Sequence, residues 1–329
     1  MKNKWNVDIG IRLQFIVVLC AERTALQFSL LQQLRHTCTS RVAVMPKTYV
    51  PPFDLPARFP FLEYKTAIRL HPRQRKVEDP RASKIGGHIA WPVDEEVPRC
   101  PEDKSPMIAV LQLRKEDVPE MPFPEGKNLF QMLWCPRDLS HEEDRPEPIP
   151  AFYWRDSEAL VHIRDKLPDP VDPEGELCPK ECALSPERVE KDLPSGTVMD
   201  FGKNNLTAVN NWIRKNAKEE LDRINGWLYD FYRSYFSVVP GTKVGGYADF
   251  GDDAIYPPCD HCKKQMEHLL TIASSEETRL EPFVEGKMTP AQREAKENGP
   301  NLCIGDVGNY HVFICRRCED WPTYSFALD

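Results

Sequence analysis

The chain lacks several features that mark common classes of protein. No stretch of about 20 uncharged apolar residues is present, so we expect no membrane span. The formal net charge of −8 over 329 residues gives no general attraction to nucleic acid or anionic lipid, and nucleic acid is not an expected partner. The patterns of Walker A loops, GxGxxG, GxSxG and HExxH are all absent. Glycine is scarce beside proline, at 16 residues against 31. The abundance of proline disfavours a helical bundle and favours strands, turns and extended connections.

Residues 1–44 differ in composition from the rest of the chain. They contain no proline and carry a net charge of +4, so the remaining residues carry −12. An apolar run at 15–21 follows basic residues, as in a secretory signal, but Arg12 interrupts the apolar region and no small-x-small cleavage site follows. We favour a native start at Met45, with 1–44 a non-native extension or a signal-like or disordered segment, and we assign it no function.

The chain contains an internal repeat. When it is shifted by 159 residues, the segment 84–113 aligns with 243–272 without a gap. Unrelated segments of ordinary composition would share about two identities over this length. Nine positions are identical: Lys84/Lys243, Gly86/Gly245, Gly87/Gly246, Asp94/Asp253, Pro98/Pro257, Cys100/Cys259, Lys104/Lys263, Met107/Met266 and Leu111/Leu270. We therefore interpret the chain as two copies of one β-rich unit.

Each copy ends in a second short apolar run followed by a cysteine, at 129–135 and 310–315, and such runs are typical of strands. The predicted fold class is α+β, β-rich and internally duplicated, with a bridging helix and a metal-binding second copy. The predicted organisation is a first repeat at 45–150, a linker with helices at 151–240 and a second repeat at 241–329.

Three helices are predicted from the chain's capping and periodicity signals. The longest, with an apolar face, spans 205–236 and would bridge the two copies. Ser185 followed by proline and glutamate predicts a capped helix start, and Thr289 followed by proline predicts another. The charged, proline-rich segment 137–150 is predicted to be an exposed loop.

The chemistry lies in the eleven cysteines. Four of them form two Cys-x-x-Cys pairs, Cys259 with Cys262 and Cys315 with Cys318, with 52 residues between the pairs. Two such turns can present four thiolates to one cation, as in a tetrahedral four-cysteine zinc site. Compact zinc ribbons use about 15–20 intervening residues, so this spacing is moderately specific. Four thiolates leave no coordination position for water, so we expect one structural zinc ion.

The first copy has a different pattern at the matching positions. Cys100 and Cys135 match the first cysteine of each pair, while Asp103 and Asp138 stand where the second cysteines would be. We interpret this as an ancestral metal site that is kept in the second copy and has decayed in the first. A zinc site of two cysteines and two aspartates is the weaker alternative.

Other roles for the thiols are less consistent with the sequence. A thioredoxin-type redox pair requires a βαβ context that is not predicted here, and disulfides require an oxidising compartment. Two Cys-x-x-Cys pairs in one unit favour metal binding in a reducing cytoplasm, where we place the protein. Cys178 and Cys182 lie four residues apart but lack partners, so we interpret them as ordinary thiols.

No candidate catalytic residues converge, and we name none. A further alternative is an enzyme of unknown reaction, using Cys303 or loop aspartates. Packing or turn chemistry explains the other polar candidates. These are His88, His261, His268, His311, Asp252, Asp253 and Asp306.

Several motifs resemble known families. The shared opening K-[IV]-G-G-x-x-x-[WF], followed by P-x-C and M-x-x-x-L-x-[LI], resembles the YwqG-like bacterial domain of unknown function, over about residues 55–329. The run LSPERV at 184–189 resembles the segment joining that domain's halves. The resemblance implies a duplicated β-rich α+β fold and no particular activity.

The second copy is also similar to the zinc-containing programmed cell death protein 2 group, through GGY, YPPCDHC and CRRC. Members of that group are implicated in chaperoning a small-subunit ribosomal protein. The similarity implies that Cys259, Cys262, Cys315 and Cys318 are metal ligands. Asp103 and Asp138 depart from the fully cysteine-bearing pattern.

From these observations we expect a non-enzymatic, zinc-stabilised protein-interaction module, chaperone-like toward a basic client, because an acidic body attracts basic partners. The alternative is an RNA- or ribosome-associated factor that uses Lys263, Lys264, Arg316 and Arg317. The sequence identifies no small-molecule ligand.

Overall fold

The computed structural model describes residues 53–136, 148–196, 202–218, 232–233, 236–250, 256–276, 299–305 and 307–328. The chain divides into the units Met1–Ala43 and Val44–Asp329, and all described residues belong to the second. Several expectations therefore fall outside the described residues. They concern residues 1–44, most of the 137–150 loop with Asp138, the aspartates Asp252, Asp253 and Asp306, and the helix expected at Thr289.

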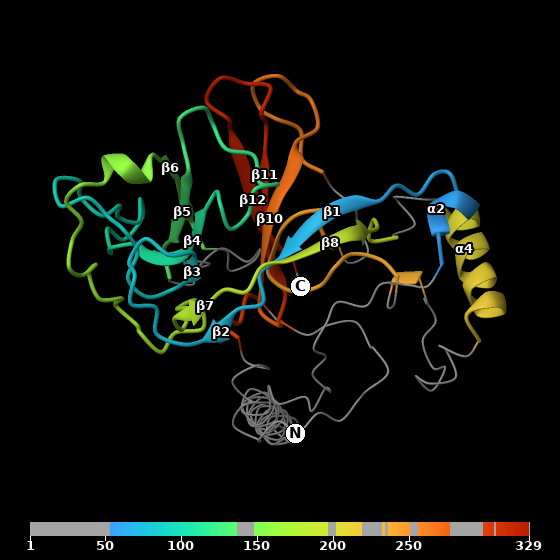
Figure 1. Cartoon of the computed structure of the whole chain (residues 1–329), viewed down its shortest axis with the longest axis horizontal. Helices are drawn as coiled ribbons and strands as arrows, with labels where there is room; N and C mark the ends of the chain where they lie inside the picture. Colours follow the sequence, from blue (N-terminus) through green and yellow to red (C-terminus); the bar gives the residue numbers. More distant parts are fainter. Residues whose placement is uncertain are drawn as a thin grey trace, which may run out of the picture. The chain divides into compact units, whose positions relative to one another are not determined.

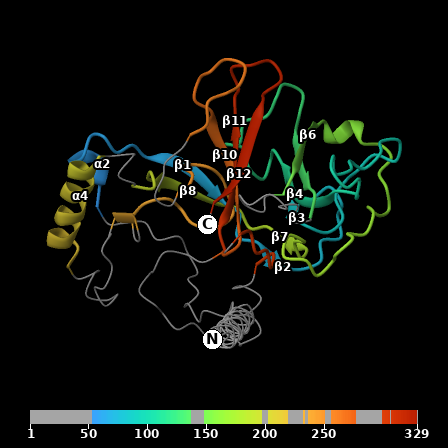
Figure 2. The same ribbon diagram turned by 180° about the vertical axis from the view of Figure 1, so that it is seen from behind.

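The second unit is built on two six-stranded antiparallel sheets, shown in Figure 1 and from behind in Figure 2. The N-terminal sheet has the order β2 (Arg73–Gln74), β7 (Cys182–Ala183), β3 (Lys84–Ile85), β4 (Ile108–Arg114), β5 (Leu129–Trp134), β6 (Pro150–Arg155). The C-terminal sheet has the order β8 (Glu187–Asp192), β1 (Lys65–Arg69), β9 (Lys243–Gly245), β10 (Glu267–Ala273), β11 (Asn309–Ile314), β12 (Thr323–Leu328).

One apolar core joins the two sheets, because alternate residues of their strands meet in it. On β5, Phe130, Met132 and Trp134 belong to this core, and on β11 Tyr310 and Val312 do. The rings of Trp134 and Tyr310 meet edge to face at 5.6 Å. Intervening positions lie on the outer face of each sheet, as the period of two in a strand requires. The predicted β-rich α+β class agrees with this architecture.

The two sheets share their local geometry as well as their strand order. The strands β3 and β4 become β9 and β10 under the shift of 159 residues, to within one residue at the end of β9. Each β4–β5 or β10–β11 ladder has a register shift at the matching place, before Leu111 and before Leu270. The expected glycine turns are present, with φ of 61° and 64° at 86–87 and 68° and 66° at 245–246. This arrangement is compatible with a duplicated unit.

Each sheet also contains a strand from outside its own repeat. Strand β1 lies within the predicted first repeat, 45–150, ahead of its aligned segment, but it belongs to the C-terminal sheet, between β9 and β8. Strand β7 follows the first repeat and pairs with β3 in the N-terminal sheet. The C-terminal sheet therefore depends on residues far away in sequence.

The segment after Ser185 corrects one prediction, because it forms strand β8 and not a helix. The backbone N–H of Ser185 donates to the Leu70 carbonyl at 2.8 Å, which continues the pairing of β8 with β1. The sequence at Ser185 has a local preference for starting a helix, but the pairing of this segment with the buried strand β1 outweighs that preference.

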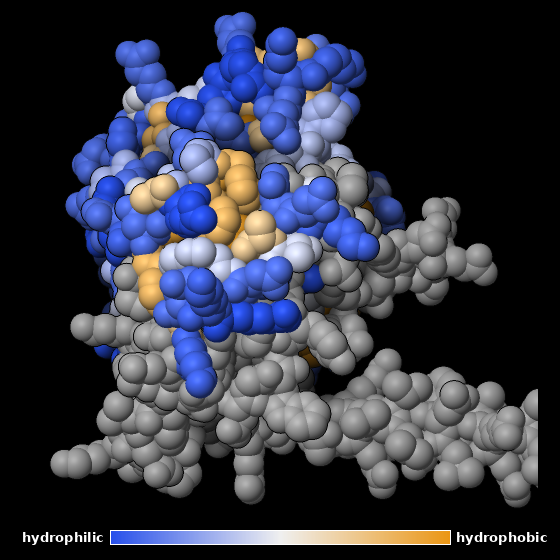
Figure 3. Space-filling model, turned by 90° about the vertical axis from the view of Figure 1, so that its right-hand side faces the viewer, coloured by the Kyte–Doolittle hydropathy of each residue, from blue (hydrophilic) through white to orange (hydrophobic). Residues whose placement is uncertain are grey.

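The helical part of the described chain is small. Helix α4 (Lys203–Asn216) confirms the first part of the helix predicted at 205–236, and residues 219–231 lie outside the described part. It packs with the short helix α2 (Leu55–Arg58) in an apolar cluster, and a 3₁₀ turn, η1, spans Ser157–Ala159. Figure 3 views the side that carries α2 and α4, where apolar surface lies among hydrophilic residues. None of the helices in the described part of the chain combines the length and apolarity that crossing a bilayer requires.

A buried lysine occupies the same place in both sheets. Lys84 donates to the carbonyls of Val77 and His88, at 3.1 and 2.9 Å, and lies 4.0 Å from Glu181. Lys243 lies 3.4 Å from Asp192, and both side chains are buried. Asp192 also accepts from the backbone N–H groups of Val239 and Tyr247, at 2.6 and 2.7 Å.

The second glycine of each turn leaves room for the carboxylate. A Cβ at Gly246 would lie 2.1 Å from Asp192 Oδ2, and one at Gly87 would lie 2.6 Å from the Glu181 side chain. The paired glycines are therefore required both by their positive φ and by these close approaches.

We expect Asp192→Ala to reduce the free energy of unfolding by about 3–5 kcal/mol, because it leaves the Lys243 ammonium buried without its carboxylate. Urea unfolding of the full chain measures this. The matched control is Asp169→Ala, which removes an exposed partner of Lys166 and should cost less than about 1 kcal/mol. Equal effects of the two substitutions would contradict the role given to Asp192.

Candidate metal centre

Strand pairing brings the two Cys-x-x-Cys pairs together despite the long interval between them. Cys259 and Cys262 precede β10, while Cys315 and Cys318 follow β11. These strands are antiparallel, and Glu267 at the start of β10 pairs with Ile314 at the end of β11. The interval of 52 residues therefore has no effect on the local geometry.

The first pair lies on a tight turn whose backbone is closed by hydrogen bonds. The N–H of Cys259 donates to the Lys264 carbonyl, and the N–H of Lys263 donates to the Cys259 carbonyl, both at 2.8 Å. Lys263 has a φ of 57°, which reverses the chain between the knuckle and β10. After β11, the N–H of Cys315 donates to the Pro322 carbonyl at 2.9 Å.

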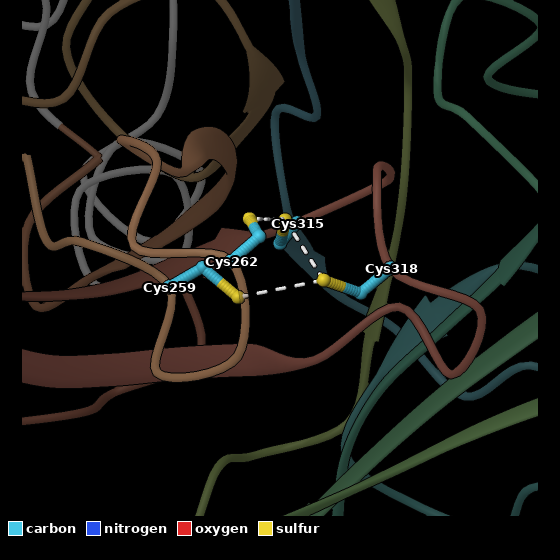
Figure 4. A group of neighbouring side chains, drawn as sticks. All are labelled: Cys259, Cys262, Cys315 and Cys318. Carbon is cyan, nitrogen blue, oxygen red and sulfur yellow. Dashed lines mark hydrogen bonds between the residues drawn. The ribbon is translucent and has the colours of Figure 1, made fainter.

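The four sulfur atoms have the spacing of a tetrahedral metal site (Figure 4). The Sγ–Sγ distances are 3.8 Å for Cys259–Cys318, 3.6 Å for Cys262–Cys315 and 3.9 Å for Cys315–Cys318. A zinc–sulfur distance of about 2.3 Å implies sulfur–sulfur edges of about 3.8 Å. The group can therefore hold a metal ion with little movement of the side chains.

One side of the site is buried in the protein and the other is close to solvent. Cys259 and Cys315 are buried against an aromatic layer, in which the Phe313 ring stacks with those of Phe250 and Phe326 at 6.0 and 5.5 Å. Cys262 and Cys318 are partly exposed. The layer holds one thiol of each pair in place, while the other two lie nearer to solvent.

The electrostatics of the turn favour thiolates. The backbone N–H of Lys264 is the main cause that lowers the pKa of Cys262 to about 6, and the N–H of Cys262 lowers the pKa of Cys259. Burial raises the pKa of Cys318 to about 12, with further contributions from the neighbouring thiols. Four thiolates within 4.8 Å of one another would repel, and a bound cation would offset that repulsion.

The described first-copy residues also meet. Cys100, Asp103 and Cys135 have ligand atoms within 4.8 Å of one another, and Asp138 is outside the described residues. His261 is exposed on the Cys259 turn and does not belong to the cysteine group.

The remaining thiols agree with ordinary packing. Cys178 and Cys182 are buried, burial raises their pKa values to about 11 and about 12, and Cys178 donates to the Asp172 carbonyl. Neither belongs to a metal-capable group among the described residues. Cys303 is partly buried, with its N–H bonded to the Glu176 carbonyl.

The basic residues of the RNA hypothesis are partly engaged within the protein. Arg316 forms an ion pair with Glu267 at 2.6 Å, and Arg317 donates to the Gln265 carbonyl. Lys263 and Lys264 are exposed. Two of the four cations are therefore already neutralised or hydrogen-bonded at the protein surface.

A buried polar row crosses the outer face of the C-terminal sheet, and its connections were not foreseen from the sequence. His268 Nδ1 donates to the Gly245 carbonyl at 3.0 Å, and His268 Nε2 is hydrogen-bonded to the Thr271 hydroxyl at 2.9 Å. Thr271 in turn contacts His311 Nδ1 at 3.0 Å. His268 and His311 are thus packed, hydrogen-bonded residues. The partner of Lys243 was also missed, because Asp192 lies outside the repeat.

This row predicts an acid-sensitive fold. Burial is the main cause that lowers the pKa of His311 to about 4; Asp249 opposes this shift and Lys243 contributes to it. Burial also lowers the pKa of His268. In the unfolded state the pKa of a histidine is about 6.5, so on acidification the unfolded state binds a proton before the folded state does. The free energy of unfolding therefore falls from about pH 6.5 to about pH 4 and then levels off. His311 alone contributes a loss of about 3 kcal/mol across that window.

The check is urea unfolding at several pH values for the wild type and for His311→Gln, a substitution chosen because Gln131 occupies the matching position of β5. The variant should have a shallower pH dependence, while His162→Gln at an exposed position should leave the slope unchanged. An unaltered slope in His311→Gln would refute the assignment.

Comparison with known protein families gives a match across residues 83–320. The match begins just before β3, contains both aligned segments and all four cysteines, and covers well over half of the chain. It excludes β1, although that strand lies inside the C-terminal sheet. A search of the curated proteins gave no match. The chain belongs to the family described as a domain of unknown function, DUF1963.

Proposed function

We propose that the chain is a non-enzymatic protein-interaction module whose C-terminal sheet is stabilised by one structural zinc ion. The observation that carries the proposal is the near-tetrahedral arrangement of four cysteine sulfurs. Two thiolates from each turn fill the zinc coordination sphere, so the ion joins two strand ends and has no open position for substrate.

We further propose that the unit arose by duplication, as in the YwqG-like domain that its motifs resemble. The matched register shifts and glycine turns support this proposal. The likeness of the second copy to the programmed cell death protein 2 group supports zinc as the metal.

The client is proposed to be a basic protein segment, handled in a chaperone-like manner in the cytoplasm. Residues 45–329 carry a net charge of −12, and such a field speeds the encounter with cationic partners. The internal engagement of Arg316 and Arg317 weakens the alternative of RNA binding.

The test is affinity capture with the zinc-loaded full chain, followed by titration of the captured partner at increasing salt. We expect a basic partner whose affinity falls as salt rises, because exposed charges are screened. Capture of RNA that is lost on neutralising Lys263 and Lys264 would favour the alternative. Turnover of a substrate by the purified chain, without any captured protein, would overturn the proposal.

A further inference from the structure

The first-copy turn has the same backbone frame as the metal-binding turn of the second copy. Cys100 N–H donates to the Ser105 carbonyl at 2.8 Å, and Lys104 N–H donates to the Cys100 carbonyl at 3.1 Å, as at the matching positions 259 and 263. Lys104 has a φ of 62°, against 57° for Lys263. Both turns close with an isolated bridge, Arg99 to Pro106 and Pro258 to Gln265.

The second thiol is held in the same way. Cys135 follows β5 as Cys315 follows β11, and its N–H donates to the Ile149 carbonyl at 2.9 Å. Strands β4 and β5 pair so that Ile108 faces Trp134, which places the start of one beside the end of the other. The duplicated frame therefore brings this thiol to the first-copy turn.

The donor set in this frame is two sulfurs and one carboxylate. The ligand atoms of Cys100, Asp103 and Cys135 all lie within 4.8 Å of one another, and both cysteines are completely buried. Soft thiolates select zinc-like ions over magnesium or calcium, and a carboxylate is an accepted zinc ligand.

Ser105 holds the carboxylate in position. Its N–H and its hydroxyl both donate to Asp103 Oδ1, at 2.9 and 2.6 Å, and the hydroxyl lies 3.8 Å from Cys135 Sγ. Hydrogen bonds of this kind orient ligands in metal sites and affect metal affinity. They fix one carboxylate oxygen and thereby set the direction of the other.

From this geometry we propose that Cys100, Asp103 and Cys135 form a second, weaker site for a divalent transition metal, of which zinc is the best fit. The cysteines bind as thiolates, so binding releases their two protons to solvent. The described residues supply three protein donors, which leaves a fourth tetrahedral position for a water molecule or an external ligand. The ligand at this fourth position can therefore exchange, whereas the four-cysteine centre has no such ligand.

The test is titration of Co²⁺ into the reduced, metal-free full chain, followed by its thiolate charge-transfer absorption. We expect two equivalents per chain, with the second bound more weakly. Ser105→Ala should weaken the second equivalent by about 10- to 100-fold, and Asp103→Ala should abolish it. Asp103→Cys, which restores the Cys-x-x-Cys spacing, should tighten it, so that a gain of binding complements the losses. Asp94→Asn, at an exposed aspartate, is the matched control.

The two sites can be tested separately. Cys262→Ser should lose the equivalent of Co²⁺ that binds to the four-cysteine centre. If it still binds the equivalent that depends on Asp103, the second site is supported independently of the four-cysteine centre. The proposal is wrong if the wild type binds a single equivalent that Asp103→Ala does not alter. It is also wrong if a second equivalent binds to the Asp103→Cys variant but not to the wild type. The Asp103–Ser105 hydrogen bonds then close the first turn without metal.

Discussion

Replacing Cys315 by serine is expected to release the tightly bound metal and to lower the stability of the C-terminal sheet. The proposed ion would bind the folded state alone, so its loss would remove stabilisation that reaches about 4 kcal/mol when free metal is a thousandfold above Kd. Cys315 is buried on the aromatic layer, and its sulfur is 3.6 Å from Cys262 Sγ and 3.9 Å from Cys318 Sγ. The measurements are metal content and urea unfolding.

The matched control is Cys303→Ser, which changes a partly buried thiol outside both metal-capable groups. It should retain full metal content and nearly full stability. Treatment of the wild type with a strong chelator should reproduce the effect of Cys315→Ser, and readdition of zinc should reverse it. If chelation leaves the unfolding curve unchanged, the proposed structural role of the metal is wrong.

A chain that begins at residue 83, where the family match starts, is expected not to fold. It lacks β1, which pairs with β9 on one side and β8 on the other. Buried Ala67 and Ile68 leave the core with this strand, and two ladders lose their partner at once. Exposed strand edges of that kind promote aggregation. Soluble yield and cooperative thermal unfolding, compared with the full chain, measure the effect.

A point substitution separates the loss of pairing from the loss of length. Ala67→Pro keeps the full chain but removes a backbone donor in the middle of β1. It should destabilise the protein strongly, while proline in place of exposed Val171, which lies outside the strands and helices of the described chain, should cost little. Cooperative unfolding of the 83–329 chain at wild-type temperature would show that β1 is dispensable.

The similarity of the two aligned segments explains how much of this fold could be predicted from the sequence. A shift of 159 residues predicted the correspondence of β3 and β4 with β9 and β10, and the two Cys-x-x-Cys pairs predicted a site that the structure brings together. These signals are local, because a Cys-x-x-Cys pair and a glycine turn each depend on only a few consecutive residues.

The features that were missed depend on contacts distant in sequence. Strand β8 follows a helix-capping signal at Ser185 but forms because β1 lies beside it. Asp192 pairs with Lys243 across 51 residues, from a position that the repeat does not contain. The placement of β1 in the C-terminal sheet and of β7 in the N-terminal sheet likewise has no marker in the aligned segments. Metal binding and the identity of the metal both stay predictions.

X-ray absorption at the zinc edge, on full chain purified in reductant and dialysed to remove weakly held metal, tests the central claim most directly. The account predicts one zinc per chain surrounded by four sulfurs at about 2.3 Å, with Cys262→Ser losing the signal. Retention of no zinc, or a tightly held zinc with nitrogen or oxygen in place of any of the four sulfurs, would contradict it.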